Sequence, residues 1–211
     1  MQQFLIKRGF SDAKKRQLIL TDEALSFESG DHLGHEFTTF KKKDIAEFRF
    51  GIRWIRFELT YGREYQIFIR DKSGKIIKIT FKSYFRRKVN ALHGQYVEII
   101  KALNRQYFDE IHDDFVRRMN AGETLKIGDV SVDLDGVSFS VSGIASQKRI
   151  EVPWKNVGLK LYYRYFSIFD TTDARSRNRG YNFHEDWNAA ILYDVLKTII
   201  DQNQTNTAQI L

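Results

Sequence analysis

Two segments far apart in the chain are near copies of one another: LTDEALSF at residues 20–27 and VDLDGVSF at residues 132–139. Each runs from an apolar residue through polar or acidic residues and a small residue to a branched apolar residue, Ser and Phe. The shift of 112 positions that aligns them also brings KDI at residues 43–45 onto KNV at residues 155–157. Because two matches share one register, the sequence predicts an internal repeat, in which one architecture is built twice.

Most of the chain carries the alternating pattern of half-buried β-strands. Between residues 17 and 81, short runs of alternating apolar and polar residues are separated by turn residues, which predicts antiparallel strands joined by hairpins. About seven strands are expected there: QLIL, ALSFES, HEFTTF, DIAEFRF, WIRFELTY, YQIFIR and IIKITF. The pattern returns after residue 122 in runs rich in Val and aromatic residues, namely TLKI, VSVDL, VSFSV, KRIEV and VGLKLYYRYFSIF.

Two segments have the helical period instead. Apolar residues recur every three or four positions within residues 95–120, which contain no Gly or Pro, so this range predicts a helix that ends at Gly122. Asn182 and Glu185 have capping-box spacing ahead of a second helix. The apolar stripe of that helix comprises Trp187, Ile191, Val195 and Ile199, widened by Leu192 and Leu196.

The order strands, helix, strands, helix predicts a mainly β protein with two domains, residues 1–120 and residues 121–211. The helix of residues 95–120 is longer than one small sheet needs, so its second half is expected to bridge to the second domain and to fix the two relative to each other. The second domain is the shorter one. A reduced hairpin near residues 167–180 is expected to account for the difference.

Composition excludes several classes of protein. The 211 residues contain no Cys, which excludes disulfides, thiol nucleophiles and Cys-based zinc sites. Since the chain has neither a signal-peptide core nor a run of about 18 apolar residues, we expect a cytoplasmic protein with no transmembrane segment. The net charge of +7 favours polyanionic partners, although mixed charges of this kind also serve solubility alone.

Several segments resemble bacterial pleckstrin-homology-like (PH-like) domains in tandem. They are the LTDEALSF hairpin, the step FKKKDIAEF with its second version VPWKNVGL, and the closing helices YVEIIKALN and DWNAAILYDVL. The resemblance covers most of residues 15–201 and implies two barrels, each of about seven antiparallel strands capped by one amphipathic helix. It also implies a module that binds phosphoinositide headgroups, peptides or proteins without catalysis. Members that bind inositol phosphates tend to carry basic residues on the first two strands. The corresponding turns here carry Asp22, Glu23, Asp133 and Asp135, which argues against headgroup binding at that place.

Two clusters of basic residues are candidates for binding an anion, a lipid or a partner protein. The first comprises Lys41, Lys42, Lys43, Arg49, Arg53 and Arg56, of which Arg49 and Arg53 share one face if they lie on a strand. The second comprises Arg175, Arg177 and Arg179, at alternate positions of the loop DARSRNRG. The alternatives are a solvated outer face whose lysines protect a strand edge, and a hairpin tip without a ligand.

The remaining motifs do not indicate a reaction. The aromatic run LYYRYF at residues 161–166 lies beside Lys160 and includes Arg164, as in single-strand nucleic-acid binders, although core packing and dimer contacts explain the same residues. The five histidines are scattered, and the chain has no metal-ligand set, phosphate loop or nucleophile motif. We therefore expect no metal, no cofactor and no enzymatic activity. The expected function is protein binding or self-association. Peripheral binding to anionic phospholipid at the inner membrane face is the alternative, and nucleic-acid binding is less favoured.

Overall fold

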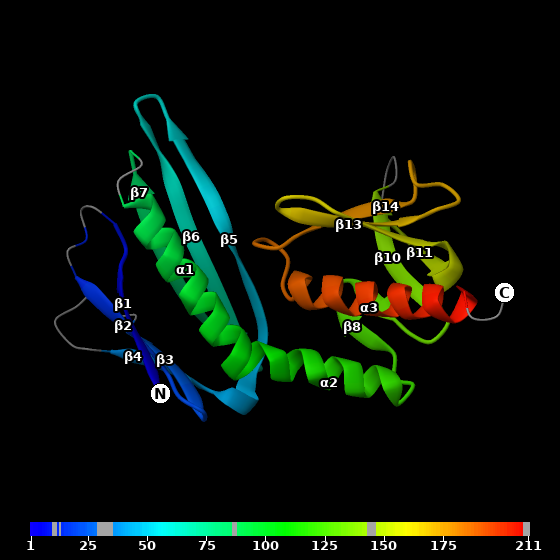
Figure 1. The fold of residues 1–211 in the computed structure, drawn as a ribbon, viewed down its shortest axis with the longest axis horizontal. Coiled ribbons are helices and arrows are strands. Elements are labelled where there is room, and N and C mark those ends of the chain that lie inside the picture. Colours follow the sequence, from blue (N-terminus) through cyan, green and yellow to red (C-terminus); the bar gives the residue numbers. More distant parts are fainter. Residues whose placement is uncertain (10–11, 13, 29–35, 86–87, 143–146, 209–211) are drawn as a thin grey trace. The chain divides into compact units, whose positions relative to one another are not determined.

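The computed structural model describes residues 1–9, 12, 14–28, 36–85, 88–142 and 147–208, and it divides the chain into two compact units (Figure 1). Unit 1 is Met1–Ile111 and unit 2 is His112–Leu211. The described residues are mainly β, with strands β1 to β14 and helices α1 to α3. The division into domains at residues 1–120 and 121–211 stays a prediction. No helix in the described part of the chain is both long and apolar enough to span a membrane.

Unit 1 begins with a four-stranded antiparallel sheet in the order β1-β2-β3-β4. Its strands are β1 (Gln2–Lys7), β2 (Lys15–Leu20), β3 (Ala24–Glu28) and β4 (Phe37–Lys41). Alternate residues of β2 and β3 are buried, because successive side chains of a strand point to opposite faces. The sequence did not predict β1, whose apolar run is short. The predicted hairpin at residues 20–27 is confirmed by the pairing of Leu20 with Leu25.

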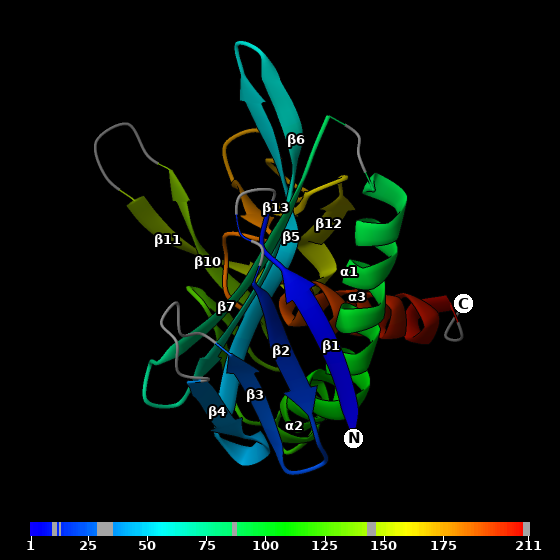
Figure 2. The ribbon, with the colours of Figure 1, turned by 90° about the vertical axis from the view of Figure 1, so that its left-hand side faces the viewer.

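A 3₁₀ turn, η1 (Lys42–Asp44), leads into a three-stranded antiparallel sheet in the order β5-β6-β7. Its strands are β5 (Ile45–Phe57), β6 (Thr60–Asp71) and β7 (Ile76–Tyr84). The prediction of two strands in DIAEFRF and WIRFELTY is wrong, because Gly51 stays in the ladder opposite Gln66 and no turn interrupts β5. The turn lies at Glu58 and Leu59 instead. Figure 2 shows the β1–β4 sheet crossing the β5–β7 sheet, with α1 beside them.

The helix that follows consists of α1 (Val89–Leu103), a π-helical turn η2 (Asn104–Phe108) and α2 (Asp109–Asn120). It begins at Val89, earlier than the predicted residue 95, and Gly94 lies within it. A glycine inside a helix weakens it by about 1 kcal/mol without ending it. The predicted end is confirmed. Gly122 has φ +80°, its N–H donates to the Met119 carbonyl (2.9 Å), and the Glu123 N–H donates to the Arg118 carbonyl (3.1 Å).

Apolar side chains of α1 and η2 form the core of unit 1 against β5, β6 and β7. The Tyr96 ring lies 5.3 Å from that of Tyr65, and Phe108 stacks on Phe48 with 3.6 Å between ring centroids. Tyr107 is 1% exposed and reaches the turn between β2 and β3. Consecutive residues Tyr107 and Phe108 are thus both buried within the π turn.

Unit 2 repeats the order of sheets. Its four-stranded antiparallel sheet has the order β11-β10-β9-β8, made of β8 (Leu125–Ile127), β9 (Val130–Val132), β10 (Gly136–Ser142) and β11 (Gln147–Pro153). A 3₁₀ turn, η3 (Trp154–Asn156), leads to a three-stranded sheet of β12 (Val157–Leu161), β13 (Tyr165–Asp170) and β14 (Asn178–Asn182). Helix α3 (Ala189–Ala208) follows and contacts β12 and η3.

Two details of unit 2 differ from the prediction. The shortened hairpin is β12–β13, whose turn lies at residues 162–164, whereas residues 171–177 form a longer loop. The expected capping box closes a separate turn, in which the Asn182 N–H donates to Asp186 Oδ2 (2.7 Å) in place of Glu185. Helix α3 begins only after Asn188, which has φ +55°. The predicted apolar stripe of α3 is confirmed for Ile191, Leu192, Val195, Leu196 and Ile199, which are buried. The inclusion of Trp187 is wrong, because it precedes α3 and is only half-buried.

The repeated segments form the same turn in both units. In unit 1 the Thr21 N–H donates to the Ala24 carbonyl (3.0 Å), and the Ala24 N–H donates to Thr21 Oγ1 (3.0 Å). In unit 2 the Asp133 N–H donates to the Gly136 carbonyl (3.1 Å), and the Gly136 N–H donates to Asp133 Oδ1 (3.0 Å). A short polar side chain therefore closes each turn at the predicted shift of 112 residues.

The step between the two sheets is also repeated. The Lys42 N–H donates to the Glu23 carbonyl (2.7 Å), and at the same shift the Trp154 N–H donates to the Asp135 carbonyl (3.3 Å). In the last hairpin of each sheet, Asp71 accepts bonds from the N–H and hydroxyl of Ser73. Asp170 accepts the equivalent bonds from Thr172.

The barrel that the resemblance implies is not closed. In the described residues β4 is not paired with β5, nor β11 with β12, because η1 and η3 turn the chain out of the ladder at these points. The sheets of unit 1 are linked by a bond from the Lys82 N–H to the Arg8 carbonyl (2.9 Å). In unit 2, Arg179 Nη1 on β14 donates to the Ser140 carbonyl on β10 (3.3 Å).

Candidate binding surfaces

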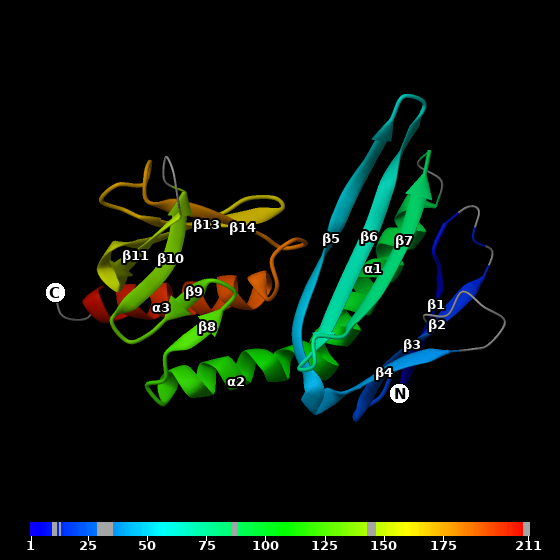
Figure 3. The same ribbon diagram turned by 180° about the vertical axis from the view of Figure 1, so that it is seen from behind.

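The β5–β6 hairpin of unit 1 exposes large apolar side chains at its end. β7 pairs with β6 only as far as Gly62, so the end of the hairpin extends beyond β7 (Figure 3). Trp54 is 46% exposed, Leu59 90% and Tyr61 50%, and the neighbouring Phe85 lies edge-on to Tyr61 with 5.7 Å between ring centroids. We call these four residues the β5–β6 tip.

The β12–β13 hairpin of unit 2 has a similar end. Leu161, Tyr162, Tyr163 and Tyr165 are exposed, with Tyr163 90% exposed. The rings of Tyr162 and Tyr165 stack at 4.5 Å, and Lys160 Nζ lies 5.4 Å from the Tyr162 ring. We call the four apolar and aromatic residues the β12–β13 tip. Of the run LYYRYF, core packing therefore explains only Phe166, which is fully buried, and dimer contacts stay a prediction for the exposed residues.

The two tips occupy equivalent places, because each lies on the first hairpin of the three-stranded sheet. Scattered exposed apolar residues are normal on a protein surface, whereas a contiguous group marks a contact site. Tyr and Trp are also the residue types enriched at protein interfaces, as is Arg. The tips are therefore the strongest candidates for a partner surface. Sequence alternation did not reveal the β5–β6 tip because it assigned Leu59 to a strand, whereas the run LYYRYF of the β12–β13 tip was noticed for its aromatic residues.

The first basic cluster is spread over several elements of unit 1. Lys41 ends β4, and Lys42 and Lys43 lie in η1, where Lys42 forms an ion pair with Glu110 (2.8 Å). Arg49 lies over the Phe68 ring at 4.9 Å. Arg56 is exposed near the end of the hairpin, opposite Tyr61.

Arg53 belongs to an ion network around the buried carboxylate of Glu64. Arg53 Nη2 lies 2.6 Å and Lys82 Nζ 3.2 Å from the Glu64 oxygens, and Gln66 donates a hydrogen bond of 2.8 Å. Burial by itself raises the pKa of Glu64, but bonds from Lys82, Gln66 and Arg53 outweigh it and hold the pKa below its usual value. Arg53 and Lys82 thus neutralise a carboxylate and contribute less to an anion-binding patch.

The second basic cluster does not converge on one point either. Arg175 is exposed in the loop, while Arg177 Nε pairs with Asp170 Oδ2 (2.9 Å). Arg179 Nη1 pairs with Asp129 (3.3 Å), and its guanidinium lies 5.4 Å from the Tyr181 ring. Two of the three arginines therefore stabilise unit 2 internally.

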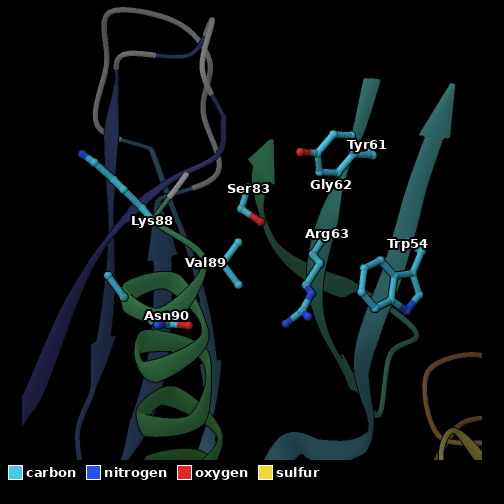
Figure 4. Close-up of a pocket in the computed structure, with 9 residues that line it drawn as sticks. Trp54, Tyr61, Gly62, Arg63, Ser83, Lys88, Val89 and Asn90 are labelled. Carbon is cyan, nitrogen blue, oxygen red and sulfur yellow. The ribbon is translucent and has the colours of Figure 1, made fainter. Parts of the chain in front are cut away.

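A pocket of about 560 Å³ lies in unit 1 between the start of α1 and the start of β6 (Figure 4). The described residues that line it are Trp54, Tyr61, Gly62, Arg63, Ser83, Lys88, Val89, Asn90 and Ala91. A side chain at Gly62 would lie 2.2 Å from the Ser83 carbonyl oxygen, so glycine is required for β6 and β7 to approach here. The sequence gives no motif for this pocket, because backbone groups at a helix start carry no signature in residue type.

In the described ranges no group of three or more His, Asp or Glu residues is arranged to hold a metal ion. Comparison of the chain with models of protein families, with curated proteins and with solved structures found no match. Function is therefore inferred from the surfaces of the two units.

Proposed function

We propose that this chain is a non-catalytic binding protein with two PH-like units, which recognises a protein partner, either another protein or a second copy of itself. The PH-like assignment is supported by the order of elements. A four-stranded sheet, a 3₁₀ turn, a three-stranded sheet and a helix follow one another in both units. Such a helix covers sheet edges and leaves hairpin ends open to partners.

The observation that carries the proposal is the pair of exposed tips. Leu59 and Tyr163 are each 90% exposed at the end of equivalent hairpins. Because both units expose apolar residues at equivalent places, these residues are not explained as the scattered apolar residues of an ordinary protein surface. A Trp or Tyr that becomes buried against a partner contributes large contact area, which is why these residues dominate binding hot spots.

The test uses the full chain with one change at each tip. Leu59→Glu and Tyr163→Glu place a charge where the side chain contacts little of its own unit, so folding is retained. Leu134→Glu is the matched control, because Leu134 is 71% exposed but lies in the turn between β9 and β10. Light scattering after size exclusion measures self-association over a concentration series. Cross-linked pull-down with the chain as bait measures capture of another protein.

The proposal predicts a dimer or a captured partner that either tip variant weakens by about tenfold or more, while Leu134→Glu has no effect. A chain that stays monomeric and captures no partner contradicts it. So does a complex that survives both tip substitutions.

Peripheral binding to anionic phospholipid is the second candidate. Arg56 is exposed beside the β5–β6 tip, and Lys160 lies beside the β12–β13 tip. Aromatic and basic side chains together suit a membrane interface. Sedimentation with phosphatidylserine vesicles, compared with neutral vesicles, tests this candidate. Equal binding to both vesicles, or to neither, excludes it.

A further inference from the structure

In the described part of the chain, no side chain caps the backbone donors at the start of α1. The first turn-forming bond runs from the Leu92 N–H to the Lys88 carbonyl (2.9 Å), so the N–H groups of Val89, Asn90 and Ala91 precede the helical ladder. Lys88 has φ +54° and makes no cap bond, and the first turn contains no acidic residue. An uncapped helix start attracts anions through these N–H groups and the helix dipole.

Ser83 supplies a second, independent feature of the same pocket. Its side chain is buried, with 2% of the residue exposed, and in the described part of the chain its Oγ has no hydrogen-bond partner. Figure 4 shows this hydroxyl directed into the space between Val89 and Arg63. A buried hydroxyl without a partner is unfavourable unless something in the pocket accepts or donates a bond.

Arg63 brings a positive charge to the opposite side of the pocket. Its guanidinium lies 4.7 Å from the centroid of the Trp54 ring, which holds it in place. Within the described residues it makes no ion pair, and no Asp or Glu lines the pocket. The Lys88 side chain points away from the pocket in Figure 4, so Arg63 is the cation that faces the space.

We propose that this pocket binds the phosphate group of a phosphate monoester. The helix N–H groups, the Ser83 hydroxyl and the Arg63 guanidinium reach the space from three sides. This arrangement suits the three terminal oxygens of a phosphate better than the two oxygens of a carboxylate. With a volume of about 560 Å³, the pocket also holds part of the molecule that carries the phosphate, beside Trp54 and Tyr61.

The test measures binding by calorimetry and by the rise in Tm of the full chain. The soluble probes are glycerol 3-phosphate and inorganic phosphate, with acetate as the carboxylate control at equal ionic strength. Phosphatidic acid vesicles present the same phosphate monoester in a lipid, so that soluble and lipid sources are distinguished. Binding of phosphate or of either ester, with weaker binding of acetate, supports the proposal. No binding of any of them overturns it.

Three substitutions locate the site. Arg63→Gln is expected to weaken phosphate binding by about tenfold. Asn90→Asp places a carboxylate in the first turn of α1, so it is expected to raise the Tm without ligand and to abolish the response to phosphate. Ser83→Ala is expected to leave the Tm without ligand unchanged or higher, because its hydroxyl has no partner among the described residues, and to weaken binding severalfold.

Arg56→Gln is the matched control, since Arg56 lies on the same hairpin but does not line the pocket. Unchanged affinity in Arg63→Gln, or equal losses in Arg63→Gln and Arg56→Gln, would overturn the proposal. Leu59→Glu separates this site from the partner surface: it is expected to weaken partner binding by about tenfold or more and to leave phosphate binding intact.

Discussion

The two units close equivalent turns with equivalent hydrogen bonds, but the first hairpins of their three-stranded sheets differ in length. β5 and β6 have 13 and 12 residues, whereas β12 and β13 have 5 and 6. A turn closed by a side chain needs one particular geometry, while a hairpin of any length satisfies its own backbone bonds. The turns closed by a side chain therefore define the shared architecture of the two units. The hairpins can differ in length and in the residues at their tips.

One half-buried carbonyl is satisfied differently in the two units. In unit 1 the Tyr107 hydroxyl lies 2.7 Å from the carbonyl oxygens of Thr21 and Ala24 and accepts a bond from the Thr21 N–H (3.1 Å). In unit 2 the indole N–H of Trp154 donates to the equivalent Asp133 carbonyl (3.0 Å). In both units this carbonyl at the turn accepts a hydrogen bond from a side chain. That side chain comes from η2 in unit 1 and from η3 in unit 2.

The largest expected effect on stability comes from a core substitution that destabilises one unit at a time. Phe27 and Phe139 are equivalent and buried, with 1% and 0% exposed. Phe27→Ala and Phe139→Ala should each lower the free energy of unfolding by about 3–5 kcal/mol, because each leaves a cavity in its own core. If the units fold independently, limited proteolysis will degrade the substituted unit and spare the other. Degradation of both units together would contradict that independence.

A smaller effect is expected from changes to Tyr107 and Trp154, the side chains that satisfy the equivalent carbonyls. Tyr107→Phe removes the hydroxyl from two carbonyls and should cost about 1–3 kcal/mol. Burial raises the pKa of Tyr107 to about 12, with a smaller contribution from Asp22, so the hydroxyl stays protonated and able to donate at neutral pH. Trp154→Phe removes a single bond at a half-buried position and should cost about 1 kcal/mol. Chemical denaturation measures both, and a larger loss for Trp154→Phe would contradict the comparison.

Acid titration should separate the two equivalent aspartates. Hydrogen bonds from the Thr172 hydroxyl and backbone lower the pKa of Asp170, and the Ser73 hydroxyl does the same for Asp71. Since the folded pKa lies below the unfolded value of 3.8, the stability contribution is present above that pH and is lost as the pH falls through the folded pKa. Asp170→Asn should therefore lower the Tm at neutral pH, and the difference from the unsubstituted chain should vanish in acid.

Asp71→Asn is the milder counterpart, because Asp71 is less buried and, among the described residues, forms no ion pair like that of Asp170 with Arg177. Thermal melts between neutral pH and pH 2 test the pair. A loss that persists unchanged in acid would show that ionisation of the carboxylate is not its cause.

The smallest expected effect concerns Lys88 and Asn188, the residues directly before α1 and α3. Lys88 and Asn188 both have left-handed backbone conformations, with φ of +54° and +55°, and each carbonyl accepts the N–H four residues on. Asn adopts this conformation more readily than Lys. Lys88→Asn should therefore stabilise the chain by about 0.5 kcal/mol, and Asn188→Lys should destabilise it, as measured by denaturant midpoints. Stabilisation by Asn188→Lys would contradict this explanation.

The sequence was most informative where local chemistry decides the structure. The shift of 112 residues located both turns and both 3₁₀ steps, because a polar side chain at Thr21 or Asp133 acts on its own backbone. Gly122 ended the helix as expected for the same reason. These features depend on a few neighbouring residues and are readable from the chain alone.

Features that depend on distant partners were not predictable. The alternation in WIRFELTY placed Leu59 on a strand face, but pairing of Phe57 with Thr60 makes it a turn residue. The partners of Arg53, Arg177 and Arg179 are carboxylates that only the folded sheets bring near. The pocket at α1 depends on Ser83 and Arg63 meeting backbone groups of another element, which no spacing along the chain reveals.

Because of the π turn at Asn104–Phe108, the core contacts of this helix depend on the number of residues in that segment. In regular α winding, neighbouring side chains project about 100° apart, so a change of winding alters which element each of two adjacent residues reaches. Here the wider winding lets Phe108 stack on Phe48 while Tyr107 closes the first hairpin turn. Deleting one residue from this segment would restore ordinary winding and force a choice between those two contacts, so length variants of the chain should avoid it.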